Sequence, residues 1–270
     1  IGQTITQYIN KGLAALTQGI RGGMAEYETQ MGATQTILAN VKDEGKGIDD
    51  VTAALDELNT YADKTIYNFT EMTRNIGMFT AAGANLDTSV ATIKGLANAA
   101  ALVGANATTA ARAWYQVSQA MAAGSFKLMD WRSLEISNIA GEGFKSVLTE
   151  VAKKDGVAID KMIEKYGSLR NTLKEGWLTA DRFAEAMKIL SGDLTKEQMT
   201  ALGYTEEQAD MLWDLAQEAV NAAVKVKSFQ QLIETTNEAI GSGWAVTFRT
   251  IIGDFERARD FYTRISQVLN

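Results

Sequence analysis

The sequence predicts an all-α fold in which long amphipathic, coiled-coil-like helices flank a compact multi-helix domain of short helices divided by glycines. None of the 270 residues is a proline, although average usage would place roughly a dozen in a chain of this length. Because proline disrupts helix interiors, its absence suits a helical chain. Apolar residues also recur at steps of three and four, and the alternation typical of half-buried strands is almost missing.

Two rods are predicted in the first part of the chain. Residues 1–47 form an N-terminal helical rod, because apolar residues recur at helical steps from Ile5 to Val41. A second rod opens the segment 48–140, and its apolar positions alternate strictly by four and three from Val51 to Ile76. That spacing is typical of a coiled-coil seam, which Thr65 weakens.

The rest of the segment 48–140 is predicted to be a small-residue helical domain. The stretch Gly83–Leu134 is rich in alanine, glycine and threonine and divides into three short helices. Short polar side chains can accept from the free N–H groups of each first turn, and the predicted caps are Asp87 or Asn85, Asn106 and Asp130. The third helix is expected to begin at Trp131, whose ring is predicted to be buried.

Shorter and longer helices follow. Residues 141–192 are predicted to contain short helices over 142–154, 158–166 and 180–190. Residues 193–270 are predicted to form a long-helix hairpin that continues into a longer parent protein. Thr195–Gln198 and Thr205–Gln208 match the capping box. A break at Gly243 then precedes a last amphipathic helix that starts at Trp244, a second predicted buried ring.

Composition excludes most chemistry. The chain has no cysteine and no histidine, so it lacks thiolate ligands, the usual zinc ligand and the commonest general base. Gly141–Ser146 resembles a phosphate-binding loop, but Phe144 separates the glycine from the lysine that should follow it. A pair of carboxylates could serve a glycosidase, yet nothing in the sequence positions one. We therefore predict no enzyme, no catalytic residue, no metal and no cofactor.

Charge and hydropathy argue against two kinds of partner. The net charge is −7 and basic residues do not cluster, which argues against sequence-specific nucleic-acid binding. The longest uncharged run, Gly95–Ala111, contains two asparagines and two threonines and is too short and polar to span a bilayer.

A series of ordered landmarks gives the chain a family likeness. The series covers roughly Asn59 to the C-terminus and consists of Tyr67–Phe69, Phe79–Gly83, Asn85–Ser89, Ile93–Asn98, Gly104–Asn106, Leu128–Leu134, Tyr166–Ser168, Glu175–Thr179, Gly203–Gln208, Lys225–Phe229, Ser242–Trp244 and Ile252–Phe255. In these residues the chain resembles an internal segment of the tape measure proteins of long-tailed bacteriophages and tail-like particles, particularly of the Gram-positive type.

The resemblance implies a structural role in the virion. Tape measure proteins fill the tail tube lumen, template tube assembly, set tail length and leave with the genome at ejection. The implied partners are the tail tube protein, the tail-tip or baseplate hub proteins and the tail assembly chaperones, with a homo-oligomer, a trimer, favoured. The implied locations are the tube lumen and tail tip, and the host cytoplasm during assembly.

Two alternatives remain open at this point. The first is a membrane-active helical segment, Gly95–Ala111, that contacts the host membrane and aids DNA passage through the envelope. The second is an unrelated helical scaffold.

Overall fold

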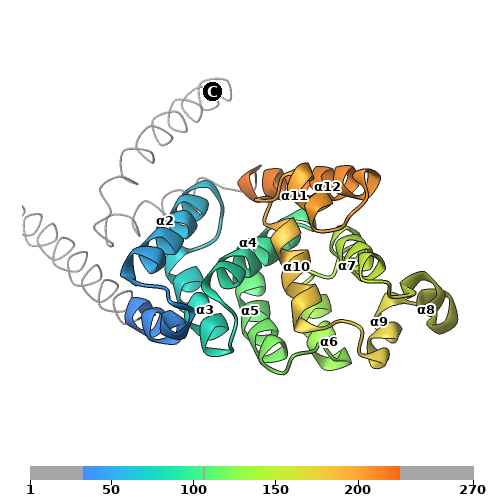
Figure 1. Cartoon of the computed structure of the whole chain (residues 1–270), viewed down its shortest axis with the longest axis horizontal. Helices are drawn as coiled ribbons and strands as arrows, with labels where there is room; N and C mark the ends of the chain where they lie inside the picture. The colour runs from blue at the N-terminus through green and yellow to red at the C-terminus, as the bar shows by residue number, and fades with distance from the viewer. Residues whose placement is uncertain (1–32, 106, 226–270) are drawn as a thin grey trace, which may run out of the picture. The chain divides into compact units, whose positions relative to one another are not determined.

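Helices build the fold throughout residues 33–105 and 107–225, which are the residues that the computed structural model describes (Figure 1). Within these ranges no strand forms, and a single isolated bridge pairs Ser125 with Thr179. The all-α prediction is therefore confirmed. Of the predicted N-terminal rod only the end, helical over 33–41, is described, and the last predicted helix from Trp244 lies outside the described residues.

Almost all of this described part belongs to one compact unit, Thr34–Lys227. Thirteen further helical elements follow residues 33–41 within the described part. They are η1 (Lys42–Glu44), α2 (Ile48–Lys64), α3 (Phe69–Ala81), α4 (Leu86–Leu102), α5 (Ala107–Ala122), α6 (Leu128–Ile136), α7 (Glu142–Lys154), α8 (Ile159–Tyr166), α9 (Leu169–Thr172), η2 (Leu173–Glu175), α10 (Ala180–Leu190), α11 (Lys196–Ala201) and α12 (Glu206–Lys225).

The predicted second rod is two helices, which corrects the sequence analysis. α2 ends at Lys64, and the backbone of the next residue, Thr65, is extended, with φ −123° and ψ −178°. The Thr65 hydroxyl donates to the carbonyl of Tyr61 (2.9 Å), and Asn68 then caps α3 by accepting from the backbone N–H of Glu71 (2.9 Å). The apolar spacing runs through the break because both helices bury the same stripe, from Val51 in α2 to Ile76 in α3.

Helix α4 lies at the centre of the fold. Fourteen of its 17 residues are buried. It packs against α10 and α12 on one side and against α2, α3 and α5 on the other. In Figure 1, α2 is drawn in blue, α3 in teal and α12 in orange. A helix buried on all sides needs small residues so that its neighbours can approach, which explains why alanine and glycine concentrate here.

The close approach is tightest at Gly95. A β-carbon there would lie 2.8 Å from the Cα atom of Met187 in α10, nearer than real β-carbons approach another atom. Only glycine therefore permits this crossing of α4 and α10. Helix α12 also approaches α4 closely, because its buried face is made mostly of small side chains. These are Ala209, Ala216, Ala219 and Ala223.

The two capping boxes are confirmed. The Thr195 hydroxyl accepts from the Gln198 N–H (3.3 Å), and the Gln198 side chain accepts from the Thr195 N–H (2.9 Å). Thr205 and Gln208 make the equivalent pair at the start of α12 (3.2 and 3.0 Å). These reciprocal bonds satisfy backbone N–H groups that an opening helical turn would otherwise leave unpaired.

Candidate functional site at the central helix

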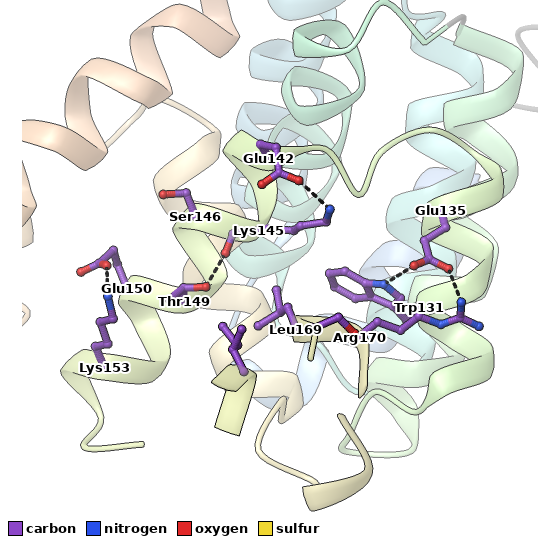
Figure 2. A pocket seen from close by; sticks show the side chains of 12 residues that line it. Trp131, Glu135, Glu142, Lys145, Ser146, Thr149, Glu150, Lys153, Leu169 and Arg170 are labelled. Carbon is purple, nitrogen blue, oxygen red and sulfur yellow. Dashed lines mark hydrogen bonds and ion pairs between the residues drawn. The ribbon is translucent and has the colours of Figure 1, made fainter. Parts of the chain in front are cut away.

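One surface hollow in the described part of the chain is a groove of about 590 Å³ between α6, α7 and α9 (Figure 2). Its charged side chains pair with one another. Lys145 contacts Glu142 (2.8 Å) and Lys153 contacts Glu150 (3.0 Å). The groove therefore offers no free charge that would hold a small charged ligand.

Three residues that line this groove contact one another. The Trp131 indole N–H donates to Glu135 (2.9 Å), whose second oxygen contacts Arg170 (3.6 Å). Figure 2 shows Glu135 between the indole and the guanidinium. This arrangement joins α6 to α9 and satisfies the only polar atom of a fully buried tryptophan side chain.

The groove also lacks the features of a catalytic site. The hydrogen bond with Glu150 raises the pKa of Lys153, so this amine stays protonated and is a poor general base. The phosphate-loop-like run forms the start of α7, where Gly141 precedes the first turn and Lys145 contacts Glu142. Among the described residues, no group of three or more carboxylates could hold a metal ion.

The more informative polar cluster is buried at α4, where two residues one helical turn apart each bridge two neighbouring helices. The first is Lys94, which is 7% exposed. Its ammonium donates to Glu57 of α2 (2.7 Å) and to both carboxylate oxygens of Asp193, just after α10 (2.6 and 2.8 Å). A buried lysine is tolerated when such partners compensate for its lost hydration.

The second bridging residue is Asn98. Its amide group donates to the carbonyl of Leu190 at the end of α10 (2.8 Å), and its oxygen accepts from the hydroxyl of Tyr61 in α2 (2.7 Å). The hydroxyl of Tyr67 donates to the carbonyl of Ala97 (2.7 Å) beside it. Burial raises the pKa of Tyr61, with the nearby Tyr67 and Asp193 adding to the effect, so its hydroxyl remains a donor at neutral pH.

Together these contacts form a polar ladder, which we define as Glu57 and Tyr61 on α2, Lys94 and Asn98 on α4, and the α10 end from Leu190 to Asp193. Apolar contacts between small side chains tolerate sliding, whereas buried hydrogen bonds are satisfied in one register only. The ladder therefore fixes how α2, α4 and α10 align. These contacts hold the three helices in position relative to one another.

The predicted site residues lie as follows. Asn85, the alternative to Asp87, is the cap of α4 and accepts from the Thr88 N–H (2.7 Å). Asp87 lies in the first turn, with its side chain 81% exposed and 3.5 Å from Lys46. Asn106, Gly243 and Trp244 lie outside the described residues.

The predicted start of the third short helix is corrected. α6 begins at Leu128 rather than Trp131, and Asp130 is its third residue. The Asp130 carboxylate accepts from the backbone N–H of Lys127 (2.7 Å), one residue before the helix. Asp130 therefore accepts a hydrogen bond at the start of α6, but it does so from inside the first turn and not from the position before the helix. An acidic side chain in the first turn is also favoured by the helix dipole.

The sequence analysis did not select the ladder residues. One signal was present: Lys94 is one of only three charged residues between Asn75 and Phe126. A charged side chain that is buried requires a partner. The identity of that partner could not be read from spacing.

The described fold is thus a helical unit with a buried polar ladder at its central helix α4. A family model described as "Tape measure protein" matches residues 22–211, more than two thirds of the chain. The chain therefore belongs to the tape measure protein family, a family of structural proteins of the bacteriophage tail. A search of curated proteins and a search of solved structures found no match.

Proposed function

We propose that this segment works as part of a molecular ruler that fills the lumen of the tail tube, templates tube assembly, sets tail length and is released with the genome. The observation that carries the proposal is the family match over residues 22–211. On this proposal the protein contacts the tail tube protein, the tail-tip or baseplate hub and the tail assembly chaperones. It assembles as a trimer, resides in the tube lumen and tail tip, and has no catalytic or sequence-specific nucleic-acid-binding role.

Helix geometry sets what each part can contribute to length. A straight helix rises about 1.5 Å per residue, so 270 residues could span at most about 400 Å. The described unit falls far below this rate when folded, because α4 is enclosed by helices from both ends of the unit. We therefore propose that straight helical parts of the protein measure length, while the unit Thr34–Lys227 is a compact domain within it.

Tail length in deletion mutants tests the ruler. Removing an in-frame helical block of about 28 residues from a straight part of the protein should shorten tails by about 42 Å, measured by electron microscopy of virions. Replacing the same block with an unrelated helical sequence of equal length is the control and should leave tail length unchanged. Unchanged tails after the deletion would reject the ruler.

Membrane activity is not proposed as a second function. Most of Gly95–Ala101, the described core of that candidate segment, is buried within α4. No described helix combines the length and hydropathy that a membrane crossing requires. A leakage assay on liposomes with a peptide covering Gly83–Gly124 addresses this alternative directly, and leakage at micromolar peptide would revive it.

A further inference from the structure

The two sides of α4 are packed differently. On the side of α10 and α12 the contacts are close and complete. Gly95 allows backbone contact with Met187, Asn98 donates to the last carbonyls of α10, and α12 presents its alanine stripe. Close packing over a long helix gives many simultaneous contacts, and these must be lost together if the helices part.

On the side of α2 a cleft of about 360 Å³ separates the helices at one end. Small side chains line it, and ion pairs span it: Glu57 with Lys94 (2.7 Å) and Lys46 with Asp87 (3.5 Å). The side chain of Glu57 is 48% exposed and that of Asp193 is 49% exposed. Water therefore reaches the two carboxylates that contact Lys94, which lowers the cost of separating these charges.

The contact of α3 with α4 and α5 has a second weakness. Three buried polar atoms find no hydrogen-bond partner within the described part of the chain, one on each of these helices: Asn75 Oδ1, Thr92 Oγ1 and Trp114 Nε1. A buried polar group without a partner opposes burial. Each of these unpaired atoms therefore weakens the packing of the helix that carries it.

We propose that α2 and α3 form a unit that opens from α4 while the rest of the domain stays folded, and that Lys94 is the latch that holds it closed. Residues 33–41 move with this unit, because Asn40 donates to the hydroxyl of Thr80 (3.1 Å) in α3. Opening exposes one apolar face of α4 without disturbing its contact with α10 and α12. This conformational property goes beyond the proposed ruler function and does not depend on it.

The charge arrangement makes the latch specific. Lys94 lies within hydrogen-bond distance of Glu57 and Asp193, so the ammonium screens two carboxylates that face each other across the opening. Removing it leaves two like charges, one on each side of the contact, and these repel. Removing one carboxylate as well relieves that repulsion.

Hydrogen exchange of the whole chain, followed by mass spectrometry, tests the proposal. In the unmodified protein the backbone amides of α2 and α3 should exchange at least tenfold faster than those of α10 and α12. Lys94→Met should accelerate α2 and α3 by a further tenfold or more and leave α10 and α12 unchanged. The double variant Lys94→Met/Glu57→Gln should recover most of the protection.

Two further variants separate the latch from a general loss of stability. Tyr61→Phe removes one hydroxyl from the ladder and should accelerate α2 and α3 selectively, by less than Lys94→Met. Lys154→Met is the matched control, because Lys154 also contacts two carboxylates, Glu185 and Asp155, but away from α2. It should not act selectively on α2 and α3. Equal exchange of α2, α3, α10 and α12 in every variant would overturn the proposal, as would a uniform acceleration by Lys94→Met.

Discussion

Replacing Gly95 with alanine tests the central claim that α4 and α10 cross at backbone contact. The added β-carbon would lie 2.8 Å from Met187 Cα and 2.9 Å from its carbonyl carbon, and closer still to its carbonyl oxygen. Ordinary contact begins at 3.4 Å, so the two helices must separate by at least about 0.6 Å, enough to weaken every contact along the crossing. Backbone atoms cannot turn away as a flexible side chain can.

The expected net effect combines a loss and a gain. Overpacking of this kind costs about 1–3 kcal/mol, and we expect the upper half of that range because the clash is with backbone. Alanine is favoured over glycine in a helix by about 0.5–1 kcal/mol, which offsets part of the loss. We expect Gly95→Ala to lower the free energy of unfolding by about 1–2.5 kcal/mol, which lowers Tm by about 2–10 °C for a chain of this size.

A matched glycine gives the control. Gly77 lies inside α3, and a β-carbon there would meet only the Thr36 methyl carbon at 4.0 Å. Gly77→Ala should therefore raise stability by about 0.5–1 kcal/mol. Thermal and denaturant unfolding of both variants, followed by circular dichroism, measures the pair. If Gly95→Ala proved as stable as Gly77→Ala, the close crossing would be wrong.

Three further outcomes are expected. Thr195→Ala removes the capping box of α11 and should cost about 1 kcal/mol, whereas Thr200→Ala, at an exposed hydroxyl in the same helix, should stay within about 0.5 kcal/mol; chemical denaturation compares them. At alkaline pH the protein should lose stability, because burial raises the pKa of Tyr61, Tyr67 and Tyr204 above the unfolded value of 10.0. The stability that these neutral hydroxyls contribute is complete below about pH 10 and is lost above it, so the tyrosinate absorbance of these three residues should appear together with unfolding of the protein. Burial alone would raise the pKa of Asp155, but the hydrogen bonds from Arg182 and Lys154 outweigh burial and lower this pKa below 3.8. The stability that the ionised Asp155 contributes is present above about pH 4 and is lost as the pH falls through the lowered pKa. Asp155→Asn should therefore make Tm less dependent on pH in the acid range.

Local features of the chain were readable because local contacts decide them. The capping boxes at Thr195 and Thr205 need only residues three positions apart, and both form as predicted. The break between α2 and α3 was missed for the opposite reason. Apolar spacing records which residues face the core, and two helices that bury one continuous stripe keep that spacing across a break.

The sequence by itself determined the helical class, the glycine-marked turns and the family, because proline content, spacing and ordered landmarks need no partner elsewhere in the chain. Only the tertiary structure decided what Lys94 and Asn98 contact inside the small-residue helix α4. Lys94 meets Glu57, 37 residues away, and Asp193, 99 residues away, while Asn98 meets the end of α10 at a separation of 92 residues. Contacts between residues so far apart in the sequence depend on how the helices cross. At Gly95 the crossing depends on where the backbone of α10 lies, and no pattern in the sequence indicates that position.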